Sequence, residues 1–168
     1  MISASPKTFQ GFTLVELIVV VGVLGILTAI AVPSFSETIL STKIRTYANT
    51  FISNAYLARN EAIKNNAPVI FCVSTNGTSC ATGGWEQGWI ILSGATVIQR
   101  QQAFSTGYKI TESSGLSSLT FQPTGIGATQ ATLTICRATP SIGSQERVVT
   151  ISATGRPSVS KTAAGVCA

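Results

Sequence analysis

A long uncharged apolar run near the N-terminus constrains this chain more than any other feature. The run extends from Phe12 to Val32, and no charged residue occurs between Leu17 and Val32. A helix of about 21 residues measures roughly 30 Å, which matches the hydrocarbon core of a bilayer. Lys7 stands on the short N-terminal side and predicts that this end stays in the cytoplasm. The run is therefore predicted to span a membrane.

Two other interpretations of the run are a cleaved secretory signal peptide and an ordinary single-span anchor. A signal peptide needs a shorter apolar core and a small-x-small cleavage site, whereas this run continues through Pro33 into a helical pattern. An ordinary anchor leaves Glu16 unexplained. A carboxylate near the start of a membrane segment is unfavourable and usually has a partner.

The residues after Pro33 have the pattern of one amphipathic helix followed by short strands. Apolar side chains recur at three- and four-residue steps up to about Asn65, and the sequence Asn65-Asn66-Ala67-Pro68 predicts the helix end. Pro33 is expected to kink the helix without ending it. β-Branched runs separated by turn compositions predict strands at residues 69–73, 89–92, 96–101, 108–110, 118–121, 132–136 and 148–153. A long helix followed by antiparallel strands is an α+β fold.

The composition argues against catalysis. The chain has no His and no Asp, and its acidic residues are six Glu against eleven Lys and Arg. A Ser-His-Asp or Cys-His arrangement and a His-ligated metal site are therefore excluded. We expect no enzymatic activity, no metal and no cofactor.

Four cysteines lie beyond the apolar run, and an even number fits two disulfides in an oxidising compartment. The alternative is a set of free thiols in a cytosolic protein. Among three possible pairings we favour Cys72–Cys80, which closes a short loop, and Cys136–Cys167, which ties the last residues to a strand. Each would contribute roughly 2.5 to 3.5 kcal/mol. No Cys-x-x-Cys spacing suggests a redox role.

The sequence Gly11-Phe12-Thr13-Leu14-Val15-Glu16, followed by the apolar run, resembles the processing signal of type IV pilins and type II secretion pseudopilins. The resemblance implies that prepilin peptidase cleaves between Gly11 and Phe12 on the cytoplasmic face, and that Phe12 is then N-methylated. Pro33 matches a proline in the first helix of such pilins. The implied segments are a leader at 1–11, a transmembrane and assembly helix at 12–33, an amphipathic helix at 34–66 and a β-rich head at 67–168.

Glu16 gains a role from this resemblance. Cleavage leaves a cationic amine on Phe12, and Glu16 lies one helical turn further on. In a bundle of pilin helices, Glu16 of one subunit can neutralise the amine of a neighbour, which in low dielectric is favourable only when both charges are satisfied. The alternative is a local interaction of Glu16 with the dipole of its own helix.

The strand region resembles the FimT/GspH type of minor pilins and pseudopilins. The matching residues are Phe71-Cys72-Val73-Ser74, Trp85-Glu86-Gln87-Gly88-Trp89 and the C-terminal Gly155-Arg156. This implies a subunit near the tip of a type IV pilus that supports assembly, or a type II secretion pseudopilin. Its head would be periplasmic, anchored by one inner-membrane span until assembly. Trp85 and Trp89 could form a ligand platform, but packing is the better interpretation.

FimT-type pilins implicated in natural transformation carry a C-terminal Gly-Arg-x-Arg motif, which suggests DNA as a partner. Here Gly155-Arg156-Pro157-Ser158 lacks the second Arg. We therefore expect any phosphate contacts from Arg156, with Lys161 and Arg147 as further candidates. From residue 66 to 168 six cations face three Glu, a net charge of +3, which is too sparse to form a groove. The alternative is that Arg156 is a solvated side chain in a turn.

Overall fold

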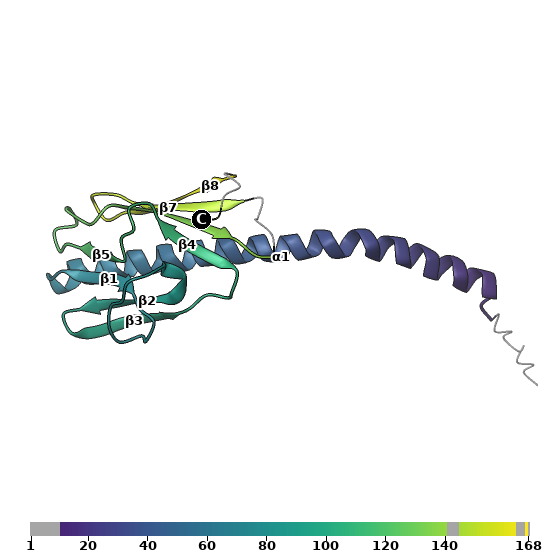
Figure 1. The fold of residues 1–168 in the computed structure, drawn as a ribbon, viewed down its shortest axis with the longest axis horizontal. Coiled ribbons are helices and arrows are strands. Elements are labelled where there is room, and N and C mark those ends of the chain that lie inside the picture. Colours follow the sequence, from purple (N-terminus) through teal and green to yellow (C-terminus); the bar gives the residue numbers. More distant parts are fainter. Residues whose placement is uncertain (1–10, 141–144, 164–166, 168) are drawn as a thin grey trace, which may run out of the picture. The chain divides into compact units, whose positions relative to one another are not determined.

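The computed structural model describes residues 11–140, 145–163 and 167. These residues form a long helix, α1 (Leu14–Asn65), and eight strands (Figure 1). They divide into two compact units, with the boundary between Thr38 and Ile39, and each unit is described by itself. Residues 1–10 of the predicted leader and residues 141–143 of a predicted turn lie outside the described residues. The segment boundaries predicted at residues 11, 33 and 66 stay predictions.

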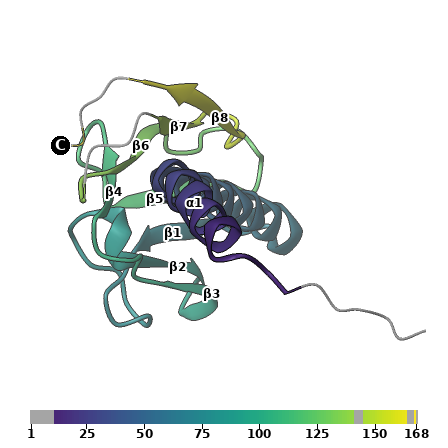
Figure 2. The ribbon, with the colours of Figure 1, turned by 90° about the vertical axis from the view of Figure 1, so that its right-hand side faces the viewer.

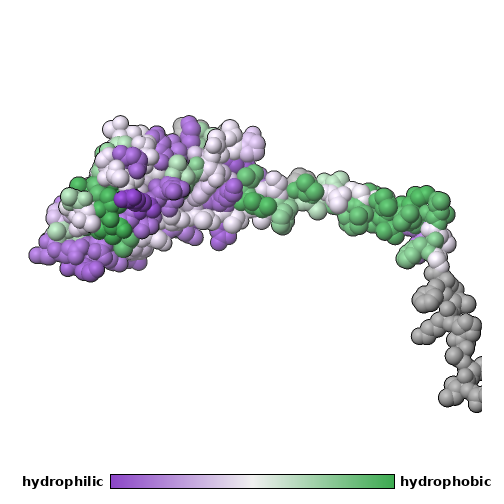
Figure 3. Space-filling model, turned by 90° about the horizontal axis from the view of Figure 1, so that it is seen from below, coloured by the Kyte–Doolittle hydropathy of each residue, from purple (hydrophilic) through white to green (hydrophobic). Residues whose placement is uncertain are grey.

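The first unit contains the apolar part of α1. Thr13 caps the helix, because its Oγ1 accepts a hydrogen bond from the Glu16 backbone N–H at 3.2 Å. The helix continues through position 33, as predicted. By length and composition α1 can cross a membrane, and the side chains of residues 14–32 are all exposed in this unit (Figure 3). Such a surface needs lipid or other protein to cover it.

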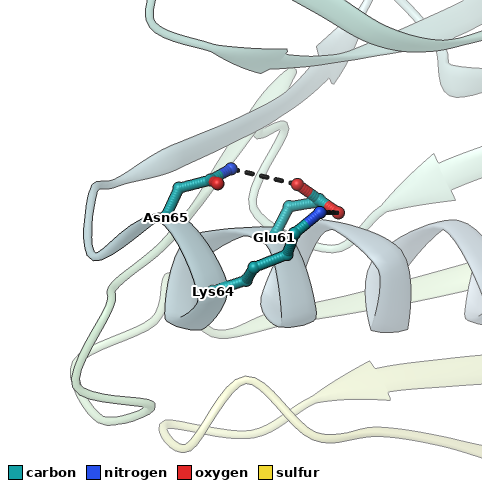
Figure 4. A network of polar contacts seen from close by, with 3 residues as sticks. All are labelled: Glu61, Lys64 and Asn65. Atoms are coloured by element: carbon teal, nitrogen blue, oxygen red, sulfur yellow. Dashed lines mark hydrogen bonds and ion pairs between the residues drawn. The ribbon is translucent and has the colours of Figure 1, made fainter.

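The helix ends where the sequence predicts. Asn66 adopts a φ of 48°, and the Ala67 N–H bonds to the Ala62 carbonyl at 3.2 Å, which is the hydrogen bond of a left-handed C-cap. Figure 4 shows the side-chain contacts of the last turn. The Glu61 carboxylate accepts hydrogen bonds from Lys64 Nζ at 3.3 Å and from Asn65 Nδ2 at 3.0 Å.

The strands form two antiparallel four-stranded sheets, and a 3₁₀ turn, η1 (Trp85–Gln87), precedes the second strand. The first sheet has the order β3-β2-β1-β5 and the second β4-β6-β7-β8. Their bounds are β1 Val69–Val73, β2 Gly88–Ser93, β3 Thr96–Gln102, β4 Tyr108–Glu112, β5 Ser118–Phe121, β6 Ala131–Arg137, β7 Glu146–Ile151 and β8 Pro157–Thr162. Seven were predicted at nearly these positions.

β8 was missed by the sequence analysis. Its residues, Pro-Ser-Val-Ser-Lys-Thr, are poor in the β-branched and aromatic types that indicate strands. β8 is an edge strand of its sheet, and a proline at the first position, polar residues and a lysine are typical of edges. The strand that carries Lys161 was therefore not predicted, because it lacks the alternation of apolar residues by which strands are recognised.

The second unit, from Ile39 onward, is built around one face of α1. Ala48, Ala55, Ala58 and Ala62 are buried on this face together with Phe51. Figure 2 shows this part of α1 between the sheet of β1–β3 and the sheet of β6–β8. Alanines have no long side chain to separate the helix from the strands, so both sheets approach it closely.

An aromatic cluster fills the space beside the alanines. The Phe51 ring lies 4.9 Å from that of Phe71 and 5.3 Å from each of Trp85 and Trp89, between centroids. Trp85 Nε1 donates to the Leu116 carbonyl at 2.8 Å. Both tryptophans are 1 % exposed or less, so the packing interpretation is confirmed and a ligand platform is not available.

Disulfide bonds join Cys72 to Cys80 and Cys136 to Cys167, which are the pairs favoured from the sequence. The first links β1 to the loop that follows it. The second attaches the C-terminal end of the chain to β6, two strands away from β8 in the sheet. Cys167 is thereby held against β6.

Glu112 joins three segments of the head at the end of β4. Its carboxylate accepts backbone hydrogen bonds from Ser114 at 2.7 Å, Leu116 at 2.9 Å and Thr132 at 3.3 Å. Burial alone would raise the pKa of Glu112, but these bonds and one from the Ser113 hydroxyl outweigh it and hold the pKa below the ordinary 4.5. The charged form is therefore the one that fits the fold.

We expect Glu112→Gln to lower the free energy of unfolding at pH 7 by roughly 1 to 3 kcal/mol, because neutral acceptors make weaker hydrogen bonds. A carboxyl whose folded pKa is depressed stabilises the fold above its unfolded pKa and loses this effect as pH falls through the folded value. The difference in unfolding free energy between Glu112→Gln and wild type should thus shrink as the pH falls below 4.5, the ordinary pKa of the carboxyl. Urea unfolding across pH measures it. Glu61→Gln is the control, because the bonds of Glu61 described above go to side chains of its own helix turn and not to the backbone of other segments. An equal loss in both variants would contradict the assignment.

Candidate functional site

The residues predicted for processing and assembly lie at the start of α1. Phe12 is 83 % exposed, and no atom lies within 4 Å of a Cβ built on Gly11. Glu16 stands in the first turn, three residues after the Thr13 cap. The spacing Thr-x-x-Glu is that of a capping box, and the structure gives one of its two bonds, from the Glu16 backbone N–H to Thr13 Oγ1.

Arg147 and Lys161 are brought together by the sheet. They are direct cross-strand partners in β7 and β8, although 14 positions apart in the sequence. Together with Val159 and Ser160 they line a hollow of about 350 Å³. Two of the three cations predicted for phosphate contact therefore share one surface.

The other wall of this hollow comes from α1. Arg45 and Asn49, one helical turn apart, line it opposite the strands. The sequence analysis gave Arg45 no role, and no sequence signal linked it to β8, which was itself missed. No carboxylate lines the hollow.

Arg156 does not join the hollow. It lies exposed in the turn before β8, where the Arg156 N–H donates to Ser152 Oγ at 3.2 Å and the Gly155 N–H donates to the Ser152 carbonyl at 2.8 Å. Lys161 lies five positions after Arg156, which corresponds to roughly 17 Å along an extended chain. The three candidate cations are thus divided between two ends of β8.

α1 also holds the turn that carries Arg156. Arg59 Nε donates to the Thr154 carbonyl at 3.0 Å, and the Tyr56 hydroxyl donates to the Pro157 carbonyl at 3.3 Å. Gly155 adopts a φ of 69° and is buried. A Cβ at this position would lie 3.0 Å from Phe121 Cδ1. The backbone position of Arg156 is therefore set by the helix and by a residue that must be glycine.

Among the described residues no group of three or more His, Cys, Asp or Glu side chains could hold a metal ion. The four cysteines are all engaged in disulfides. The arrangement supplies cations, hydroxyls and amides, which can bind anions, and an apolar helix, which can pack with lipid or with other helices.

Two family models match the chain. The model described as type II transport protein GspH matches residues 47–155, and the model described as prokaryotic N-terminal methylation motif matches residues 6–32. The first covers α1 from position 47 to its end and every strand except β8. The second covers the predicted cleavage site and the apolar run.

Individual relatives agree with these models. Two curated Pseudomonas aeruginosa proteins, each named fimbrial protein, are 32 % identical over 93 residues, which is 55 % of this chain and 60 % of each relative. The chain thus covers less than two thirds of those relatives. Two crystal forms of the Pseudomonas aeruginosa type IV minor pilin FimU match with TM-scores of 0.55 and 0.58 at 22 % and 21 % identity. They cover 69 % and 71 % of this chain and 91 % and 90 % of theirs, and at this identity the match concerns the fold.

The tight fit of Gly155 predicts that Gly155→Ala lowers the free energy of unfolding by roughly 1 to 3 kcal/mol. Gly94→Ala is the matched control, because Gly94 has a similar φ of 58° but no atom within 4 Å of its Cβ position. Gly94→Ala should lose only the part of the unfolding free energy that comes from placing a side chain at a positive φ. Urea unfolding of both variants measures the difference, and a loss for Gly155→Ala no greater than for Gly94→Ala would contradict the packing argument.

Proposed function

Because this chain belongs to the GspH family, whose members are structural pilin-like proteins, we propose that it is a minor pilin. In this proposal it is incorporated into a type IV pilus near the tip and supports assembly. The proposal rests on one observation: in the N-terminal unit, residues 14–32 of α1 are all exposed. Lipid covers such a surface before assembly, and the helices of other pilins cover it afterwards.

The N-terminal methylation motif implies processing by prepilin peptidase and assembly with other pilins. We assign cleavage to the bond between Gly11 and Phe12, which the exposed residues ahead of α1 would present to the peptidase. The new amine on Phe12 would then meet Glu16 of a neighbouring subunit. Its pairing with an opposite charge removes the unfavourable free energy of two separate charges in a helix bundle.

The pilus is preferred to a secretion pseudopilus because the curated relatives are named fimbrial proteins and the fold matches that of a minor pilin. The family description names type II transport, so a GspH-like pseudopilin is the alternative. Deletion of the gene distinguishes the two. Loss of piliation with normal protein secretion supports the pilin, and loss of secretion with normal piliation supports the pseudopilin.

We expect Glu16→Ala to be processed and membrane-inserted, but incorporated into sheared pili at a small fraction of the wild-type level. Glu16→Gln is the matched control, since glutamine preserves the capping-box pattern while removing the charge. If pairing with a neighbour's amine matters, both variants fail. If Glu16 serves only the start of its own helix, Glu16→Gln is incorporated normally.

The same Glu16 variants also test the cleavage by prepilin peptidase. N-terminal sequencing of wild type and both Glu16 variants should begin at Phe12, whereas Gly11→Val should stay uncut in the membrane. A mature protein that starts at another residue would refute the assigned cleavage site.

A second candidate function is DNA binding by the head, supported by the cross-strand placement of Arg147 and Lys161. Arg156 is the further contact, from the position that matches the Gly-Arg motif. Such contacts are to phosphates, so binding would be independent of base sequence and weakened by salt.

For DNA we expect micromolar affinity at best in low salt, with a log–log salt slope of about −2 to −3. Arg156→Ala combined with Lys161→Ala should weaken binding and reduce the slope by about 2. Arg100→Ala, on β3 of the other sheet, is the control cation. Titration of the detergent-solubilised chain with labelled duplex tests this. No shift at tens of micromolar protein, or an unchanged shift in the double variant, would remove DNA as a partner.

A further inference from the structure

The hollow between α1 and β8 gathers three cations from three different elements. Arg45 comes from α1, Arg147 from β7 and Lys161 from β8. The remaining lining residues, Asn49, Val159 and Ser160, carry no charge. The whole chain has eleven Lys and Arg among 168 residues, so three of them around one hollow is a pronounced local concentration of positive charge.

This concentration is unfavourable for the protein alone. Arg147 and Lys161 are directly opposite each other in the sheet, and like charges in that position destabilise a strand pair. Arg45 adds a third charge from the helix, and no lining residue of the hollow is acidic. An anion in the hollow would add an attraction to each of the three cations and so offset their mutual repulsion.

The Arg147 side chain is held in place for such a contact. Its Nη1 donates to the Glu146 carbonyl at 3.1 Å, and the side chain is half-buried. A guanidinium carries five N–H donors, so this bond fixes the group while leaving donors for a ligand. Arg45 and Lys161 are more exposed and can adjust to what Arg147 orients.

We propose that Arg45, Arg147 and Lys161 form a binding site for one phosphate group, with Asn49 as a neutral donor. Three cations and one neutral donor match the charge and the several acceptor oxygens of a phosphate better than a single carboxylate, which has two oxygens. At about 30 Å³ per water, a hollow of about 350 Å³ has room for the group and several waters.

The same chemistry is offered by free phosphate and by the phosphodiester of a nucleic acid. The inference deepens the DNA-binding candidate, whose cations it shares in part, and adds Arg45 as a contact that no sequence motif indicates. It does not depend on incorporation into a pilus. Failure of phosphate binding therefore leaves the proposed pilin function intact.

The test uses the full chain in a non-ionic detergent. Inorganic phosphate is titrated by isothermal calorimetry in low-salt buffer, with chloride at equal ionic strength as the reference. Arg45→Gln, Arg147→Gln and Lys161→Gln should each weaken phosphate binding by about tenfold or more. Arg100→Gln, on β3 of the other sheet, is the matched control and should leave the affinity unchanged. Thermal melting checks that each variant is folded.

Three results would overturn the site. The first is no heat of binding with wild type up to tens of millimolar phosphate. The second is an affinity that Arg45→Gln leaves unchanged. The third is an equal loss in Arg100→Gln, which would indicate an effect of net charge alone. A duplex added in competition distinguishes the sources. If it displaces phosphate, the hollow accepts a phosphodiester. If phosphate binds and duplex does not displace it, the site is specific for the free anion.

Discussion

The fold of the head depends on the close packing of one α1 face against two sheets. Ala48, Ala55, Ala58 and Ala62 bring the strands close to the helix, and Phe51 extends into the aromatic cluster between them. Larger side chains at the alanine positions would push the sheets away, because interiors at native density have little free volume. The same contact places the polar edge of the helix next to β7 and β8. The position of Arg45 beside Lys161 is thus a consequence of how the core packs.

α1 obeys two different rules along its length. In the head its apolar residues follow a stripe, and the stripe is buried. Between Leu17 and Val32 it carries no charge and, apart from Thr28, is apolar on every side, and every side is exposed. A helix that is hydrophobic all round is stable only inside a bilayer or a bundle. The N-terminal part of α1 therefore needs a bilayer or other helices to cover its apolar surface. The apolar stripe of the part in the head is already covered by the strands of its own chain.

The sequence analysis predicted the parts of the fold that local patterns determine. The end of α1 was found because Asn66 and Pro68 act locally, and seven strands were found from β-branched and aromatic residues. β8 was missed because an edge strand gains little from apolar residues and carries proline and lysine instead. The division into two sheets and the place of Arg45 depend on contacts between residues far apart in the sequence. No spacing rule contains that information.

The division of the cations along β8 bears on what kind of anion the head can distinguish. Arg156 and the hollow of Arg147 and Lys161 lie at opposite ends of a strand, roughly 17 Å apart along the chain. A single phosphate can occupy only the hollow. Duplex DNA carries one charge per about 1.7 Å of its axis, so one molecule can contact both ends at once. Since β8 is tied to α1 by Tyr56 and paired with β7 along its length, the spacing between the two ends is rigid. A nucleic acid would therefore gain binding free energy from contacts at both ends of β8. A small anion, held only in the hollow, would depend on Arg45 for its third contact.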